Sequence, residues 1–235
     1  MDSKGNLKAI FVQNMFAQIA QRYELMNTLM TAGQDRRWQR WVVHQTQLRR
    51  GGRLLDIGTG TGGIGRTALA QHGDLFVTAG DFTLEMMQTG RCYSYGSQIR
   101  WCGADALNLP FRDNAFDAVT SGYLMRNVSD PLRALIEQRR VLKPGGRMVC
   151  LDTSPPPRNI LYPLIMLHLK FGIPLMGRLI TGNSLAYQYL PESTQSFMTP
   201  AKLADMMRLA GFSNVSYRRF MFGTIAVHVG RQIDK

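Results

Sequence analysis

The stretch LLDIGTGTGGIGRT, residues 54–67, combines the end of an apolar strand, a glycine-rich turn and the start of a helix. Such turns bind phosphates or nucleosides, because N–H groups at the helix start face the ligand and glycine permits close approach. Gly58, Gly60 and Gly63 satisfy the dinucleotide pattern G-x-G-x-x-G, and residues 60–67 nearly satisfy the phosphate-loop pattern. The sulfonium nucleoside S-adenosylmethionine (SAM) is a third candidate, and the glycines alone do not separate these ligands.

Residues around the turn favour the sulfonium nucleoside. Arg66 stands where a phosphate loop needs lysine, and no strand resembles the magnesium-holding partner of such a loop. Asp81 suits a dinucleotide as well as SAM, because a carboxylate about 20 residues after the glycine turn can bind ribose hydroxyls. Asp56 stands two residues before the first glycine, where its charge would repel a pyrophosphate but attract an ammonium or sulfonium group.

Three aspartates, Asp56, Asp81 and Asp105, end successive expected strands. At Asp105 a carboxylate could bind the adenine amino group, while Ala106 and other apolar neighbours pack on the ring. Any one of these aspartates could instead be a helix cap. All three, together with glycines at 58, 60 and 62, fit adenosine with a cationic tail, so the sequence predicts a SAM site.

A parallel sheet would bring these strand ends together. Short apolar strands are expected at 53–58, 75–81, 99–105, 115–122 and 147–153, mostly separated by helical stretches. This alternation predicts a mostly parallel sheet covered on both faces. Upstream, the apolar residues spaced as on one amphipathic helix are Val12, Phe16, Ile19, Tyr23 and Met26, and a basic helix follows at 36–46.

The last third of the chain departs from this alternation. Residues 158–198 are expected to form a mostly helical insertion. A helix follows, with Thr199 as its cap, Pro200 in its first turn and Gly211 at its end. Strands at 213–223 and 224–232 are joined too tightly to be parallel. We therefore expect one domain over 1–235, comprising a helical cap (1–50), a SAM-binding core (51–157), the insertion (158–198) and a closing helix and hairpin (199–235).

Charge is distributed unevenly along the 235 residues. The formal net charge is +12, with +6 in residues 1–53, zero in 54–157 and +6 in 158–235. Basic flanks can attract anionic phospholipid or nucleic acid, or can simply keep the protein soluble. Three cysteines without paired spacing or a nearby histidine cluster predict neither a disulfide framework nor a metal site.

The expected location is cytoplasmic, with peripheral association at the inner face of a membrane as an option. Residues 1–18 lack the apolar core of a signal peptide. The most apolar stretch, Asn159 to Ile180, is interrupted by His168, Lys170 and Arg178, two prolines and two glycines, so it is not expected to span a bilayer. It would instead cover a pocket or lie in the lipid interface.

Four further stretches carry a family resemblance: YELMNTLMTAGQDRRW (23–38), LMRNVSDP (124–131), RVLKPGGRMVCLDTS (140–154) and YQYLPES (187–193). Together they resemble the ubiquinone/menaquinone biosynthesis C-methyltransferases, a family of class I SAM-dependent methyltransferases, over nearly the whole chain. KPGG before a strand is common to many methyltransferases, whereas the first and last stretches are more specific. The resemblance implies a Rossmann-like fold with a seven-stranded, mostly parallel sheet whose last strand is antiparallel.

The resemblance also implies residue roles in SAM binding. Asp81 would bind the ribose, Asp105 and Ala106 the adenine, and Thr61 the methionyl end. Tyr23 would close over the cofactor as part of a lid, although spacing alone indicates a core tyrosine. The expected cofactor-binding set is Tyr23, Asp56, Gly58, Gly60, Thr61, Gly62, Asp81, Phe82, Asp105, Ala106 and Gly122.

Arg126 and Asn127 are the candidate catalytic residues. A guanidinium stays protonated, so Arg126 is expected to stabilise a phenolate oxygen and orient water, with Asn127 supporting it. A surface arginine capping the loop is the alternative. The candidate substrate contacts are Leu124, His168, Tyr187, Tyr189 and Glu192. His168 could be a general base or simply a packed or solvated histidine.

The implied reaction is ring C-methylation of a prenylated quinol, demethylmenaquinol or a 2-polyprenyl-benzoquinol. A hydroxyl proton leaves, negative charge reaches the unsubstituted ring carbon, and that carbon attacks the sulfonium methyl in line. An apolar insertion suits the ring and prenyl tail, and basic flanks suit an anionic membrane. Ring type, tail length and oligomeric state, a homodimer included, stay open.

Some positions depart from the family pattern. Glu24, Asp35 and Asp152 stand where Asp, His and Glu are usual, and Gly122 and Leu124 stand where Ser and Gly are usual. These changes should spare cofactor binding but reshape the wall near the acceptor, so another lipid or aromatic acceptor is the alternative. A nucleic-acid methyltransferase would need an aromatic–basic recognition module, and a non-enzymatic subunit would need a damaged turn. We expect neither, and no nucleic-acid partner.

Overall fold

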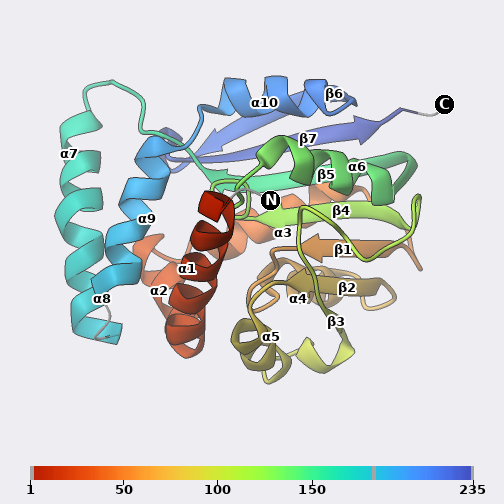
Figure 1. Cartoon of the computed structure of the whole chain (residues 1–235), viewed down its shortest axis with the longest axis horizontal. Coiled ribbons are helices and arrows are strands. Elements are labelled where there is room, and N and C mark those ends of the chain that lie inside the picture. Colours follow the sequence, from red (N-terminus) through yellow and green to blue (C-terminus); the bar gives the residue numbers. More distant parts are fainter. Residues whose placement is uncertain (1–2, 182–183, 234–235) are drawn as a thin grey trace.

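The computed structural model describes residues 3–181 and 184–233 as one α/β unit (Figure 1). Its sheet strands are β1 (Arg53–Ile57), β2 (Phe76–Asp81), β3 (Arg100–Gly103), β4 (Phe116–Gly122), β5 (Leu142–Thr153), β6 (Phe212–Phe220) and β7 (Ile225–Gln232). They form a seven-stranded sheet in the order β3-β2-β1-β4-β5-β7-β6. All neighbours pair in parallel except β7, which is antiparallel to both β5 and β6.

Helices cover both faces of this sheet. Those of the core are α3 (Asp35–Thr46), α4 (Gly63–Gln71), α5 (Leu84–Arg91), η2 (Gly96–Gln98), α6 (Pro131–Val141) and α10 (Pro200–Leu209), and the 3-10 turn η4 (Met221–Gly223) joins the two closing strands. Alternate residues of the central strands face opposite layers: Leu54 packs with α3 and α4, whereas Leu55 packs with α6 and α10. The sheet is therefore buried on both sides, as the run of short apolar strands predicts.

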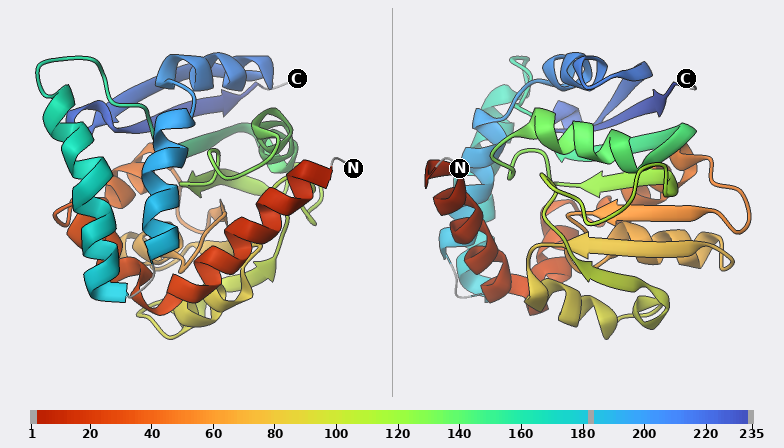
Figure 2. Two further views of the ribbon diagram at one scale, coloured as in Figure 1. Left: turned by 60° about the vertical axis from the view of Figure 1, so that its left-hand side comes forward. Right: turned by 45° about the vertical axis from the view of Figure 1, so that its right-hand side comes forward.

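The remaining helices form a third layer, called here the cap. It consists of α1 (Ser3–Ile19), η1 (Ala20–Arg22), α2 (Tyr23–Met30), α7 (Tyr162–Leu167), the π-helical turn η3 (His168–Gly172), α8 (Ile173–Thr181) and α9 (Ser184–Ser196). An apolar cluster that includes Met26, Leu169 and Tyr187 holds its two chain segments together. Figures 1 and 2 show the cap beside the edge where the parallel strands end, so this cap covers the predicted site.

The expected single N-terminal helix is wrong in one respect. The helix is broken at η1, and the chain restarts as α2 at Tyr23. The break redirects the chain so that α2 reaches the glycine-rich turn, where Glu24 makes polar contacts described below. The expected strands and their order along the chain are otherwise confirmed, each within a few residues except β5, which begins earlier.

Candidate cofactor and substrate site

The three aspartates of the sequence motif lie at the carboxyl ends of β1, β2 and β3, which are neighbours in the sheet. Asp56 is 1 % exposed and accepts hydrogen bonds from Thr59 Oγ1 at 2.5 Å and Thr120 Oγ1 at 2.7 Å. Burial raises the pKa of the Asp56 carboxyl to about 6, although these bonds oppose the shift. The carboxylate is therefore fixed in place and favours a cationic neighbour.

Asp81 is held by the glycine turn itself. Its carboxylate accepts the backbone N–H of Gly60 at 2.7 Å and that of Thr83 at 2.8 Å. Burial raises the pKa of Asp81, and these N–H donors oppose that shift. Each carboxylate oxygen keeps further lone pairs, so Asp81 can still accept hydroxyl groups from a ligand.

Gly58 and Gly60 leave room that a larger residue would occupy. Gly60 has φ +56°, a region that other residues rarely adopt, and a Cβ there would lie 3.1 Å from Met86 Cε and 3.8 Å from Tyr23 Cε1. A Cβ at Gly58 would lie 2.7 Å from Leu124 Cδ1. Glycine at these two positions thus keeps the space beside the turn free of side-chain atoms.

Two cavities meet at this turn, and a third adjoins them at Tyr23 and Tyr123. Cavity A, about 780 Å³, lies under α1 and is lined by Gly58, Gly60, Asp81, Phe82, Asp105, Ala106, Gly122 and Leu124, among others. Cavity B, about 380 Å³, is lined by several charged and polar side chains, among them Glu24, Asn27, Asp35, Arg36, Asp56 and Thr61. Cavity C, about 580 Å³, lies between the cap and the core, and its mostly apolar lining includes Met15, Met26, Ile165, Leu169 and Ile173.

Two tyrosines separate these cavities. Tyr23 and Tyr123 each line all three of them. A molecule extended from cavity A into cavity B would therefore face a molecule in cavity C across the gap between these rings. Tyr123 has φ +58°, an uncommon conformation for a residue other than glycine, and such backbone strain concentrates at functional sites.

Arg126 lies in the wall of cavity C and is paired with a buried carboxylate. Its Nη1 donates to Asp152 Oδ1 at 2.7 Å, and the two side chains are 4 % and 1 % exposed. The guanidinium also lies over the Tyr123 ring, 5.1 Å from the centroid. Its Nε has no hydrogen-bond acceptor among the described residues. The guanidinium is thus fixed in orientation, and its Nε–H can still donate a hydrogen bond to a ligand.

Asn127 connects the opposite walls of the site. Its Nδ2 donates to the Tyr123 carbonyl at 2.8 Å, and its Oδ1 accepts the hydroxyl of Tyr189 at 3.1 Å. Because Tyr189 belongs to α9, this contact ties the cap to the loop after β4. Tyr187, from the same helix, also lines cavity C, as does His168.

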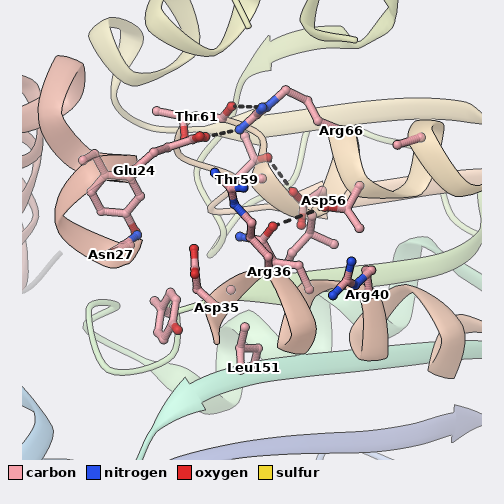
Figure 3. Close-up of a pocket in the computed structure, with 18 of the residues that line it drawn as sticks. Glu24, Asn27, Asp35, Arg36, Arg40, Asp56, Thr59, Thr61, Arg66 and Leu151 are labelled. Carbon is pink, nitrogen blue, oxygen red and sulfur yellow. Dashed lines mark hydrogen bonds and ion pairs between the residues drawn. The ribbon is translucent and has the colours of Figure 1, made fainter. Parts of the chain in front are cut away.

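Three side chains fasten the cap over the core. Lys8 Nζ donates to the carbonyls of Arg126 and Val128, both at 3.1 Å, and Gln13 Nε2 donates to the carbonyl of Phe82 at 3.1 Å. Figure 3 shows Glu24 reaching from α2 to Thr61 and Arg66. The Thr61 hydroxyl donates to Glu24 Oε1 at 2.9 Å. Polar contacts therefore join α1 and α2, which line cavities A and B, to the core.

Cavity B also carries both signs of charge. Figure 3 shows that Glu24, Asp35 and Asp56 approach it from α2, α3 and β1, and the arginines that line it are Arg36, Arg40 and Arg66. Neither Arg36 nor Arg40 forms an ion pair with any described acidic side chain. Such a lining can hold a zwitterion, with its cation near the carboxylates and its anion near the free guanidinium groups.

Comparison with known proteins decides the family. The model of the ubiE/COQ5 methyltransferase family matches residues 3–232. The chain belongs to this family. The fold is shared more widely, because a SAM-dependent methyltransferase of Thermotoga maritima superposes with a TM-score of 0.65 at 20 % identity, covering 94 % of this chain and 99 % of that one.

Family relatives match over most of their length. The ubiquinone/menaquinone biosynthesis C-methyltransferase of Desulfotalea psychrophila is 48 % identical over 93 % of this chain and 89 % of its own. The demethylmenaquinone methyltransferase of Thermus thermophilus is 42 % identical over 92 % and 99 %. By contrast, the [4+2]-cyclase SpnF has a TM-score of 0.70 at 18 % identity, with 95 % and 96 % covered, so the fold alone does not set the reaction.

Family membership confirms the expected enzyme class, a SAM-dependent methyltransferase, and the expected Rossmann-like fold. Most of the expected site residues do meet at the three cavities, while their roles stay predictions. Among the described residues no group of three or more His, Cys, Asp and Glu side chains is arranged to hold a metal ion. In the same part of the chain no helix is both long and apolar enough to cross a bilayer.

Three expected positions lie elsewhere than the sequence indicates. Gly62 lines none of the three cavities, because it faces Trp101, and a Cβ there would lie 2.6 Å from that ring. Leu124 lines cavity A, not the apolar cavity C, because it folds over Gly58. Glu192 is exposed and lines none of the three, because it lies on the outer side of α9.

Other site residues were not expected. Tyr123 follows the end of β4 and has no motif of its own, although its position directly before the LMRN stretch could have suggested it. In the sequence Glu24, Asp35 and Asp152 stand out only as departures from the family pattern, yet each contributes a carboxylate to the site or to its support. Lys8 has no sequence signal, because its partners are 118 and 120 residues away.

Proposed function

We propose that the chain methylates a ring carbon of a prenylated quinol, demethylmenaquinol or a 2-polyprenyl-benzoquinol, with SAM as the methyl donor. The observation that carries this proposal is the meeting, at Tyr23 and Tyr123, of two cavities whose linings include carboxylates and one cavity whose lining is mostly apolar. A charged nucleoside suits the first two, and a ring with a hydrocarbon tail suits the third. The names of the family relatives agree with this substrate class.

The residues present fit SAM in size and chemistry. In cavity A, Asp81 would accept the ribose hydroxyls and Asp105 the adenine amino group, with Phe82 and Ala106 against the ring. In cavity B the amino-acid end would place its ammonium toward Asp56 and its carboxylate toward Arg36. When bound, this donor supplies an electrophilic methyl group. The open glycine cradle at Gly60 supports this placement.

Cavity C would receive the quinol. Its lining of methionine, isoleucine and leucine side chains suits a prenyl tail, since about 25 cal/mol is gained for each Å² of apolar surface buried. The ring would lie at the inner end, between Tyr23 and Tyr123, within reach of Arg126. His168 and Tyr187, from the lining of the same cavity, are further candidates for contact with the ring or tail.

Arg126 would act as a fixed positive charge and not as a base. A guanidinium does not lose its proton at working pH, but its N–H groups can stabilise the phenolate oxygen that forms when a quinol hydroxyl loses its proton to water. Negative charge would then reach the ring carbon, which could take the donor's methyl group as the methyl–sulfur bond breaks, and the proton on that carbon would leave to water. Asp152 and the Tyr123 ring hold the guanidinium in orientation, so it need not reorganise during the reaction.

Methyl transfer from labelled SAM tests this proposal. Wild type, Arg126→Gln and the surface control Arg208→Gln would each be given short-tailed demethylmenaquinol and a short-tailed demethylated benzoquinol. We expect wild type and control to methylate at least one quinol, and Arg126→Gln to lose about 100-fold in kcat with little change in SAM affinity. Methylation of total RNA instead of either quinol, or full activity of the Arg126 variant, would contradict the proposal.

Because prenylated quinols dissolve in membranes, we also propose that the chain works as a peripheral protein at an anionic membrane surface. The excess of basic residues in the two flanking segments supports this location.

A further inference from the structure

The segment α7–η3–α8 has apolar side chains on two opposite sides. Its inner side packs into the cap cluster through the buried residues Leu169 and Ile173. Its outer side presents Leu164, Leu167, Phe171 and Leu175, which are between 57 and 66 % exposed. An apolar side of a helix needs an apolar neighbour, and the described chain supplies one only for the inner side.

These four exposed residues form what we call the outer stripe. Their spacing of three or four residues places them along one side of the helix. In Figures 1 and 2 the segment is the outermost helix of the cap, with the other cap helices between it and the sheet. A contiguous exposed apolar patch marks an interaction surface, whereas single exposed residues such as Leu209 on α10 are ordinary.

Cavity C opens next to the outer stripe. Leu29, Leu161, Leu164 and Phe222 all line this cavity, and each is also between 36 and 67 % exposed. Side chains that both line a cavity and meet solvent mark its mouth. The mouth is therefore ringed by apolar side chains, and it joins the outer stripe at Leu164.

The exposed charged side chains beside the outer stripe are basic, which favours an anionic partner. Arg158, Lys170 and Arg178 are exposed, and residues 157–181 contain no Asp or Glu. An apolar stripe edged by basic residues is typical of helices that lie in a lipid interface. A second copy of this chain would bring like charges together, because each copy carries +12. An anionic bilayer carries the opposite charge.

We propose that the outer stripe inserts into the headgroup and upper acyl region of an anionic bilayer, so that the mouth of cavity C opens into the lipid. This inference rests on the proposed function, because a prenyl tail is what would pass through that mouth. The tail then moves from bilayer to cavity without crossing water, and the ring follows it toward Tyr23 and Tyr123.

The test compares two double variants. L167S/L175S removes two stripe residues that do not line cavity C, and I136S/L209S removes two exposed apolar residues from α6 and α10 as the matched control. Cosedimentation with vesicles of phosphatidylcholine and phosphatidylglycerol measures binding. We expect wild type and control to bind equally and to release as salt rises. The stripe variant should bind at least about tenfold more weakly with an unchanged melting temperature.

Methyl transfer then separates docking from chemistry. With a long-tailed quinol embedded in the vesicles, the stripe variant should lose about tenfold in rate, whereas with a short-tailed soluble quinol it should equal wild type. Failure of every protein on the soluble quinol would refute the proposed function and leave the vesicle result standing. Equal vesicle binding by the two double variants would overturn the docking proposal. So would a wild-type dimer that L167S/L175S dissociates, because a second copy would then cover the stripe.

Discussion

Replacement of Asp152 by asparagine tests whether the buried ion pair holds Arg126 in the wall of cavity C. Nη1 of Arg126 and Oδ1 of Asp152 are 2.7 Å apart, and both side chains are almost fully buried. Removal of one partner leaves an uncompensated buried charge, which costs about 3–5 kcal/mol. Asparagine keeps a carbonyl acceptor at nearly the same place, so we expect the lower value, about 3 kcal/mol.

The assay is urea and thermal unfolding. For a chain of this size, a loss of about 3 kcal/mol corresponds to a fall of about 6–12 °C in Tm. The double variant R126Q/D152N should regain most of the loss, because neither charge remains. Asp117→Asn is the matched control: its ion pair with Lys143 is 2.6 Å long but more than a third exposed, so it should cost about 1 kcal/mol or less.

Two results would refute this reasoning. One is an Asp152→Asn variant whose free energy of unfolding stays within about 1 kcal/mol of wild type. The other is a double variant that is less stable than Asp152→Asn alone, since that would mean that Arg126 does not depend on its counterion. At temperatures far below Tm, Asp152→Asn should also lower kcat, because the guanidinium would no longer be held toward the ring.

Three further predictions concern the cofactor. Burial raises the pKa of Asp56 to about 6, so protonation below that pH removes the charge that attracts the donor's cation. Calorimetry should show SAM affinity falling below pH 6 in wild type and falling less in Asp56→Asn, where Asp81 still titrates with a raised pKa; equal falls in the two proteins would contradict this role of Asp56. Glu24→Gln removes the ion pair with Arg66 that holds α2 against the core. We expect calorimetry to show about tenfold weaker SAM binding in this variant. Unchanged affinity would mean that α2 does not act as a lid over the cofactor. Gly60→Ala places a Cβ in the cradle at φ +56°, whereas Gly33→Ala places one in open space at φ +73°. Both variants should lose about 1–2 kcal/mol of stability on urea unfolding. Only Gly60→Ala should also lose SAM binding. Equal SAM affinity in the two variants would show that the space beside Gly60 does not hold the cofactor.

The sheet and the three aspartates could be predicted because both depend on local signals. Runs of apolar residues that end in Asp56 or Asp81 identify strands and also locate their carboxyl ends. In a parallel sheet the carboxyl ends of neighbouring strands lie at the same edge, so the aspartates must lie together. The sheet and the grouping of the aspartates can therefore both be predicted without knowledge of side-chain packing.

Contacts between distant segments could not be predicted in this way. No glycine or proline in the sequence signals the break at η1. The break places α2 so that Glu24 can contact Thr61 of the glycine turn, and the sequence does not show that contact. Gly62 matches the pattern of a ligand-binding glycine, but the sequence does not reveal that Trp101 fills the space beside it. The partners of Lys8 lie more than a hundred residues away, so no periodicity could indicate them.

The fastening of α1 has a consequence for turnover. Ala9, Val12, Gln13 and Phe16 of this helix form the roof of cavity A, and the bonds from Lys8 and Gln13 keep that roof shut. We expect donor exchange to require those bonds to open, whereas the proposed route of the quinol is the mouth of cavity C. We therefore predict that movement of this helix limits repeated turnover, so that a viscous buffer lowers the steady-state rate and leaves the rate of a single turnover unchanged.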